Sequence, residues 1–317
     1  MMSYLFAAAA LVAAPPAESS IEAPGPLGRL NGTMLMPAGT PLAVIMIVPG
    51  SGPTDRDGNS PMGVRAAPYR LLAEGLAARG VATVRIDKRG LFGSRAAVAD
   101  TAAVTVADYA ADVHQWAKAI RARTGASCIW VAGHSEGALI ALAAAQDRSD
   151  LCGLVLISGM GRKFGEVLRA QLRANPANAP ILDQAFAALA ALESGRRVDT
   201  VAMNPALLPL FAPKVQGFLI SLLSADPAAL ATHVRLPVLI VQGDKDLQVT
   251  VEDARLLHAS DPKATLIIVP GANHVLKAVN SADQAANFAT YADPSLPLAP
   301  GIVDSVAAFV APPRGAR

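Results

Sequence analysis

A serine between a histidine and a glutamate is flanked by two glycines in the segment IWVAGHSEGALIALAAA, residues 129–145. The apolar residues before it are typical of a buried strand, and the small apolar residues after it favour a buried helix. A sharp turn between them brings backbones close together, and Gly133 and Gly137 remove side chains that would collide there. Ser135 would project from the turn, with the N–H of Glu136 at the helix N-terminus, which favours developing negative charge. The pattern predicts a nucleophilic serine; the alternative is a glycine-rich turn with a serine cap.

A serine hydroxyl needs a base, and the base is usually oriented by a carboxylate. Among the five histidines, His274 is the candidate because it follows the apolar run TLIIVPG in a loop, at the edge where parallel strands would end. His134 is adjacent to Ser135, and its ring is expected to point away from the hydroxyl. The other three lie in predicted helices or at the exit of a predicted insertion: His114, His233 and His258.

The carboxylate is expected at the end of the preceding strand, in PVLIVQGDKD, which offers Asp244 and Asp246. Asp244 directly follows the strand and is expected to form a hydrogen bond within its own turn. Asp246 lies further out in the loop and is therefore favoured. With Ser135 and His274 this gives the chain order Ser, Asp, His, which is associated with the nucleophile elbow of α/β-hydrolases.

Serine chemistry also needs donors for an oxyanion. One is the backbone N–H of Glu136, directly after the nucleophile. The second is expected from the loop VPGSGPTDRDGNS after the first long parallel strand, where Gly50 and Gly52 let the backbone approach an acyl group. We expect the N–H of Ser51 to serve, with that of Gly52 in reserve; a flexible glycine-rich surface loop is the alternative.

The elements that must position these residues can be read from the apolar runs. Six runs are short and continuously apolar, as expected for strands covered on both faces of a parallel sheet. Helical patterns lie between them, for example over residues 106–120 before Gly125, and an antiparallel opening is expected around residues 30–37. The pattern predicts an α/β fold with a mostly parallel central sheet flanked by helices. The six runs are 43–48, 81–86, 128–132, 154–157, 238–241 and 266–269.

One interval carries no strand pattern. Residues 159–235 show helix-like patches and prolines, which we interpret as a helical cap insertion over the C-terminal edge of the sheet, where open α/β sheets bind ligands. A separate small helical domain is the alternative. The expected organisation is therefore a hydrolase core of residues 18–158 and 236–317, interrupted by this cap.

The N-terminal residues 1–17 have the layout of a secretory signal, an apolar stretch followed by proline and small residues, although no Lys or Arg precedes the stretch. We expect a leader and a periplasmic or secreted protein, with a disordered leader and a cytoplasmic location as the alternative. The apolar stretch is too short to predict a membrane span. Cys128 and Cys152 fall near the starts of neighbouring predicted strands, so they are either two buried thiols or one disulfide.

Composition argues against a polyanionic partner. The 317 residues carry a formal net charge of +2 with 16% charged residues, so no basic surplus points to nucleic acid or an anionic membrane. The hydrophobic fraction is 52% with only 4% aromatic residues, which suits close packing of helices on a sheet.

Several segments together resemble one known family. They are similar to motifs of the α/β-hydrolase superfamily, and most closely to bacterial serine esterases grouped with serine-aminopeptidase-like hydrolases. The segments are GHSEG, GSGPTDRDG, RIDKRGLFGS, and GDKD with ANH. The resemblance spans the chain from residue 30 to the C-terminus. It departs from many relatives at Pro49-Gly50, where they have His-Gly before the oxyanion residue.

The resemblance implies a serine hydrolase with neither metal nor cofactor, and a cap that corresponds to residues 159–235. The site residues that it implies are a triad and two oxyanion donors: Ser135, Asp246 and His274, with Glu136 and the Ser51 loop. We expect cleavage of small-molecule carboxylic esters with small to medium uncharged acyl groups through an acyl-enzyme.

Three alternatives stay open at the level of sequence. An exopeptidase would need an anchor for a free α-amino group, such as Glu166 or Asp183 in the cap. An acyltransferase would use the same acyl-enzyme and exclude water. A binding protein without catalysis would keep only the architecture.

Overall fold

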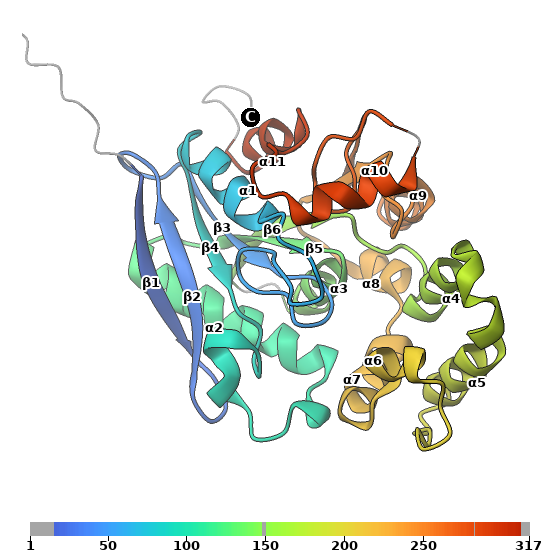
Figure 1. Cartoon of the computed structure of the whole chain (residues 1–317). Coiled ribbons are helices and arrows are strands. Elements are labelled where there is room, and N and C mark those ends of the chain that lie inside the picture. Colours follow the sequence, from blue (N-terminus) through green and yellow to red (C-terminus); the bar gives the residue numbers. More distant parts are fainter. Residues whose placement is uncertain (1–15, 148–149, 282, 312–317) are drawn as a thin grey trace, which may run out of the picture.

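The computed structural model (Figure 1) describes residues 16–147, 150–281 and 283–311. Its centre is an eight-stranded sheet in the order β1-β2-β4-β3-β5-β6-β7-β8. β1 pairs antiparallel with β2 and β2 with β4, whereas the other neighbours are parallel. All six predicted strands and the antiparallel opening are confirmed; β1 was not expected. The strands are β1 (Ala17–Pro24), β2 (Arg29–Met36), β3 (Ala43–Val48), β4 (Val81–Ile86), β5 (Ile129–His134), β6 (Leu151–Ile157), β7 (Val238–Gly243) and β8 (Thr265–Val269).

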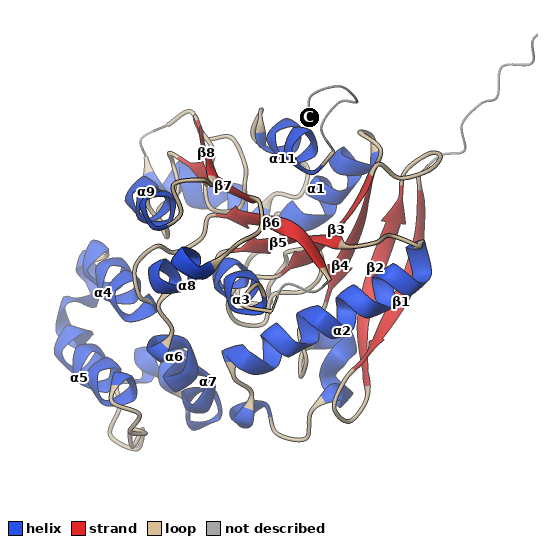
Figure 2. Cartoon of the chain, turned by 180° about the vertical axis from the view of Figure 1, so that it is seen from behind, coloured by secondary structure: helices blue, strands red, loops and turns tan. Residues whose placement is uncertain are grey.

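Helices cover both faces of the sheet (Figure 2). Residues of α1 and α11 share one buried cluster with alternate strand residues, and residues of α2, α3, α8 and α9 share the other. This two-sided covering explains why the parallel strands are apolar throughout. The helices of the core are α1 (Pro68–Ala77), α2 (Val106–Thr124), α3 (Glu136–Ala144), α8 (Pro227–His233), α9 (Val251–Ser260), α10 (Gln284–Ala289) and α11 (Ile302–Val310), with 3-10 turns η1 (Phe92–Ala97), η2 (Thr101–Ala103) and η5 (Thr290–Ala292).

Local signals define where two core helices begin and end. In α2, Thr105 and Asp108 form a capping box, and Gly125 closes the helix in the left-handed conformation at φ 74°. Thr250 and Asp253 form the same capping box at the start of α9. α9 therefore begins directly after the loop that carries Asp246.

The interval between β6 and β7 contains helices joined by loops and, in residues 158–237, no strand. Its apolar side chains form a separate cluster that packs on the first turns of α2 and α3 through Val106 and Leu139. A side-chain bond from Gln171 to the Gln248 carbonyl, at 2.8 Å, joins the cap to the loop of Asp246. The elements of this cap are α4 (Phe164–Ala174), η3 (Pro176–Ile181), α5 (Leu182–Glu193), η4 (Pro205–Leu207), α6 (Leu208–Phe211) and α7 (Pro213–Ser224).

Two of the expected boundaries differ from the structure. The expected cap, residues 159–235, includes α8. In the structure Ala231 and Val234 are buried in the main core cluster, so the core resumes at α8 rather than at residue 236. The sequence does not separate α8 from the cap helices, because helical periodicity indicates an apolar face but not the cluster on which that face packs. At the N-terminus, Ala17 already belongs to β1 and not to a leader. Residues 1–15 lie outside the described residues, so the leader itself remains an expectation.

No single helix in residues 16–147, 150–281 and 283–311 is long and apolar enough to cross a bilayer. One pair bent by 59°, Pro205–Phe211 with Pro213–Ser224, reaches the length and hydropathy only when its two helices are joined. Both helices of that pair contribute buried residues to the cap cluster, including Phe211 and Leu222.

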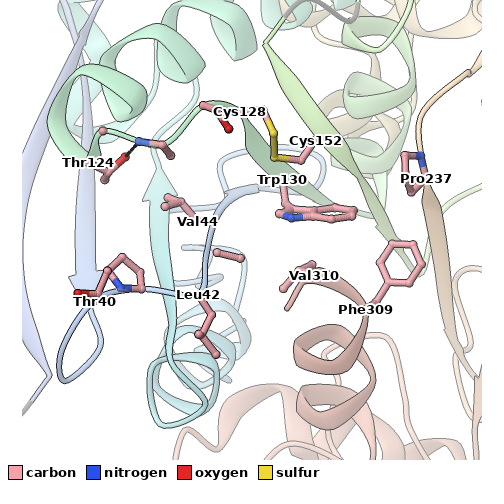
Figure 3. Close-up of a pocket in the computed structure, with 15 residues that line it drawn as sticks. Thr40, Leu42, Val44, Thr124, Cys128, Trp130, Cys152, Pro237, Phe309 and Val310 are labelled. Atoms are coloured by element: carbon pink, nitrogen blue, oxygen red, sulfur yellow. Dashed lines mark hydrogen bonds between the residues drawn. A yellow bond between two sulfur atoms is a disulfide. The ribbon is translucent and has the colours of Figure 1, made fainter. Parts of the chain in front are cut away.

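Cys128 and Cys152 are joined by a disulfide between the start of β5 and the start of β6. Both cysteines are half-buried and line a cavity of about 810 Å³ at the amino ends of the strands (Figure 3). Trp130 and Phe309 are among its apolar lining residues, and their ring centroids lie 5.4 Å apart. Because Ser135, Asp246 and His274 all follow the carboxyl ends of strands, this cavity lies at the opposite edge of the sheet.

Removing this disulfide should destabilise the protein. The bond closes a loop with a sequence separation of 24, and the chain-entropy cost of such a loop predicts a loss of about 3 kcal/mol in the free energy of unfolding. We expect Cys128→Ser/Cys152→Ser to show this loss in urea denaturation under non-reducing conditions. The rate of the expected hydrolysis should be unchanged, because the disulfide and the candidate catalytic residues lie at opposite edges of the sheet. Equal denaturation midpoints for the variant and the wild type would contradict the prediction.

Candidate active site

Ser135 lies at the turn between β5 and α3, as the sequence predicts. Its backbone has φ 55° and ψ −119°, a conformation that costs an L-residue about 1 to 3 kcal/mol and marks functional sites. The two flanking glycines are required: a Cβ on Gly133 would lie 2.1 Å from the Gly137 oxygen, and one on Gly137 would lie 2.3 Å from the Val48 oxygen. The turn therefore holds a strained serine above the sheet.

Asp246 and His274 are paired. His274 Nδ1 lies 2.8 Å from Asp246 Oδ2, and both side chains are buried. The other carboxylate oxygen, Oδ1, accepts the N–H groups of Gln248 at 2.8 Å and Val249 at 2.9 Å. Since the carboxylate accepts the proton on Nδ1, the ring nitrogen that remains for proton transfer is Nε2.

The carboxylate of Asp246 is held in its charged form. Burial alone would raise its pKa, but the His274 imidazole and the N–H donors of Val249 and Gln248 outweigh burial and lower the pKa below the ordinary 3.8. Because the folded-state pKa is lowered, this carboxylate stabilises the fold above pH 3.8 and loses that contribution as the pH falls further. Asp246 thus stays ionised at neutral pH.

The other acid in this loop, Asp244, has a different role from the one predicted. It accepts the N–H of Gly271 at 2.7 Å, so it ties the loop after β7 to the loop after β8 rather than closing its own turn. Asp244 is therefore not the partner of His274, and the preference for Asp246 agrees with the geometry.

His134 connects the nucleophile turn to the histidine loop. Its ring lies 4.7 Å from the ring of His274 between centroids, and its Nε2 lies 2.8 Å from the His274 carbonyl oxygen. His274 is thereby held next to the residue that precedes Ser135, at the sheet edge where Asp246 also lies. Both ring nitrogens of His134 are engaged, so His134 is not available as a base.

Tyr69 of α1 completes this connection. The Gly50 N–H donates to the Tyr69 oxygen at 3.1 Å, and the Tyr69 hydroxyl lies 2.9 Å from His134 Nδ1. Burial lowers the pKa of His134 to about 3, with the charge of His274 as a second cause, so the ring is neutral. A carbonyl can only accept, so His134 Nε2 carries the proton and Nδ1 accepts from Tyr69. A directional chain of hydrogen bonds therefore runs from Gly50 to His274.

We expect Tyr69→Phe to lower kcat about tenfold and the free energy of unfolding by about 1 to 3 kcal/mol, because it leaves the buried Gly50 N–H and His134 Nδ1 unpaired. Ester kinetics and urea denaturation measure the two effects. Tyr109→Phe is the matched control, since the Tyr109 hydroxyl has no hydrogen-bond partner in the described part of the chain. Equal effects of both substitutions would contradict this role of Tyr69.

The two expected oxyanion donors belong to two segments that adjoin Ser135, the start of α3 and the loop after β3. Glu136 is the first residue of α3, so its N–H has no acceptor within the helix. In the second segment, a Cβ on Gly50 would lie 3.3 Å from the Ser135 Cβ, which places the loop after β3 against the nucleophile. Ser51 follows Gly50 and is exposed, and no acceptor in the described chain bonds to its N–H. Gly52, the reserve donor, has φ 68° and is also exposed.

The sequence pattern did not single out two residues of this site, Tyr69 and Lys88. Lys88 Nζ lies 2.7 Å from Glu136 Oε1 and 2.7 Å from the Gly50 oxygen. The one available signal was the position of Lys88 in RIDKRGLFGS, directly after a strand that ends at the same sheet edge. Within the described residues, no group of three or more His, Cys, Asp or Glu could hold a metal ion.

Comparisons with known proteins identify the family of the chain. The family described as serine aminopeptidase, S33, matches residues 62–278. Esterase EstD of Thermotoga maritima is 28% identical over 228 residues, which make up 72% of this chain and 52% of EstD, so the chain spans about half the length of this curated relative.

Two solved structures share the fold. Est1E from Butyrivibrio proteoclasticus has a TM-score of 0.52 and 18% identity, over 86% of this chain and 95% of that one. The α/β hydrolase GrgF from Penicillium sp. sh18 has a TM-score of 0.57 and 18% identity, over 81% of this chain and 91% of that one. At these identities the likeness is one of fold.

Proposed function

Because the chain belongs to the family of S33 serine aminopeptidases and has the α/β-hydrolase fold, we propose that it is a serine hydrolase. Its proposed substrates are carboxylic esters. The observation that carries the proposal is the pairing of His274 with a buried Asp246 beside the strained turn of Ser135. The esterase names of EstD and Est1E support the choice of an ester over an amide.

In the proposed mechanism, His274 Nε2 takes the proton of the Ser135 hydroxyl as the oxygen attacks the ester carbonyl. The negative charge that develops on the carbonyl oxygen is stabilised by the N–H groups of Glu136 and Ser51. His274 then protonates the leaving alcohol, and an acyl-enzyme remains on Ser135. Water, deprotonated by the same imidazole, releases the acid and restores the enzyme.

The proposed substrates have small to medium uncharged acyl groups. The cap helix α4 meets the loop of Asp246 through an apolar cluster that contains Met160, Val167 and Val249. An acyl group bound between this loop and the aliphatic cap would lie in apolar surroundings, where a charge would be desolvated without a partner, so we expect an uncharged acyl chain.

The family description supports an exopeptidase as the second candidate. Such an enzyme needs a carboxylate that binds the free α-amino group of its substrate. The two acids expected for this role, Glu166 and Asp183, are both exposed in the first turns of α4 and α5. Their exposure makes either a weak anchor, since solvent screens exposed charges.

A panel of p-nitrophenyl esters of increasing chain length, run beside aminoacyl p-nitroanilides, tests the proposal. We expect the short esters to be cleaved with a kcat/KM at least about tenfold above that of any anilide, and a fluorophosphonate probe to label Ser135. Higher activity on the anilides would favour the exopeptidase. Transfer of the acyl group to an added alcohol in preference to water would favour an acyltransferase. Absence of labelling would favour a binding protein without catalysis.

We also propose that the protein works in the periplasm or outside the cell. The disulfide between Cys128 and Cys152 supports this location, because disulfides persist in oxidising compartments and are rare in the cytosol. Cell fractionation of the native host followed by thiol alkylation and mass spectrometry tests the proposal. Two free thiols in a cytoplasmic fraction would contradict it.

A further inference from the structure

Lys88 and Glu136 form a buried ion pair next to the loop that begins at Gly50. Lys88 follows β4 by two residues and is 4% exposed, and its partner Glu136 is 1% exposed. Besides Glu136, the ammonium donates to the Gly50 carbonyl, and the Tyr109 ring covers it with its centroid 5.2 Å from Nζ. A buried lysine is costly unless its donors find acceptors, and here the acceptors belong to the two segments that supply the proposed oxyanion donors.

The bond to the Gly50 carbonyl sets the direction of the next N–H group. The carbonyl of Gly50 and the N–H of Ser51 belong to the same planar trans peptide, so they point in opposite directions. Because Lys88 holds the carbonyl toward the interior, the N–H of Ser51 must point out of it. A charged donor on the carbonyl also polarises this peptide and makes its N–H a stronger donor.

The same glycine is held from its other side. Tyr69 accepts the N–H of Gly50 at 3.1 Å, so both peptide groups of Gly50 have buried partners. Further along the loop, the N–H of Arg56 donates to Asp87 Oδ1 at 3.0 Å. Two consecutive residues, Asp87 and Lys88, therefore attach this loop to the end of β4.

We propose that Lys88 is a positioning residue for the oxyanion hole: its ammonium orients the Gly50–Ser51 peptide and, through Glu136, joins that peptide to the first turn of α3. The inference rests on the proposed function, in which the N–H groups of Ser51 and Glu136 stabilise the oxyanion. The Lys88 ammonium bonds to the Gly50 carbonyl and to Glu136, so we expect its effect on the oxyanion of the transition state rather than on substrate binding.

The test replaces the whole ion pair, because Lys88→Met alone would leave Glu136 buried and unpaired. We expect Lys88→Met/Glu136→Leu to fold and to hydrolyse p-nitrophenyl acetate with a kcat about 100-fold below wild type, near the effect of losing one oxyanion donor. KM should stay within about threefold of wild type, and the rate of fluorophosphonate labelling should fall in parallel with kcat.

The matched control is Arg89→Met/Asp112→Leu. This ion pair is also buried, with Arg89 Nη2 2.6 Å from Asp112 Oδ1. Arg89 is the residue after Lys88, but among the described residues neither member of the pair bonds to the loop that carries Gly50 and Ser51. We expect kcat of the folded control to equal that of wild type. An equal fall of kcat in both double variants would assign the effect to general destabilisation and overturn the proposal.

A kcat within twofold of wild type in the folded Lys88→Met/Glu136→Leu protein would also overturn it. If that protein does not fold, Lys88→Arg decides, because a planar guanidinium cannot place its donors as the compact ammonium does. We then expect kcat about tenfold lower at unchanged KM, and a wild-type kcat would refute the inference. A wild-type enzyme with neither ester turnover nor probe labelling would instead refute the proposed function.

Discussion

Ser135→Ala is expected to reduce kcat for ester hydrolysis about a million-fold, because the nucleophile of a serine hydrolase and its base act as a unit. The remaining rate would come from the oxyanion donors and substrate binding, which the substitution leaves in place. Steady-state kinetics with a p-nitrophenyl ester measures the fall, with mass spectrometry of the labelled protein as a second readout. A variant that retains more than about 1% of wild-type kcat would exclude Ser135 as the nucleophile.

A second substitution at the same position separates chemistry from folding. Ser135 has φ 55°, which alanine tolerates no better than serine, whereas glycine adopts such a conformation without strain. We therefore expect Ser135→Gly to be as inactive as Ser135→Ala and yet about 1 kcal/mol more stable than it in urea denaturation. If the alanine variant were the more stable of the two, the strain inferred at this turn would be absent.

Asp246→Asn is expected to lower kcat about 10⁴-fold without unfolding the protein, because it changes the tautomer of the base. Oδ1 of Asp246 accepts the N–H groups of Gln248 and Val249, so the oxygen of an asparagine should keep that position. Its NH₂ group would then face His274 Nδ1 and donate to it. The proton of the imidazole would move to Nε2, the atom that has to receive the serine proton.

The control for this substitution is Asp244→Asn, in the same loop. Asp244 uses Oδ1 to accept the N–H of Gly271, and an asparagine oxygen can do the same. We expect kcat of this variant to stay within about twofold of wild type. If Asp244→Asn were the inactive variant and Asp246→Asn the active one, the assignment of the acid would be wrong.

The strand pattern determined the fold and the three residues expected to carry the chemistry. Strands that are buried on both faces are apolar throughout, and this signal is local in the sequence. Because the carboxyl ends of parallel strands meet at one edge, residues that follow β5, β7 and β8 must approach one another. The approach of Ser135, Asp246 and His274 to one edge could therefore be inferred although they lie far apart in the sequence.

The tertiary structure alone decided how that edge is held together. Tyr69 and Lys88 bond to Gly50 from α1 and from the end of β4. Residue type does not distinguish Tyr69 from an ordinary core tyrosine, and the position of Lys88 after a strand does not tell which acceptors its ammonium finds. The same holds for α8, whose helical pattern is clear but whose burial in the main core depends on its neighbours. Local sequence sets where elements begin and which face is apolar, whereas the partner of a buried polar group is chosen by the packing of distant segments.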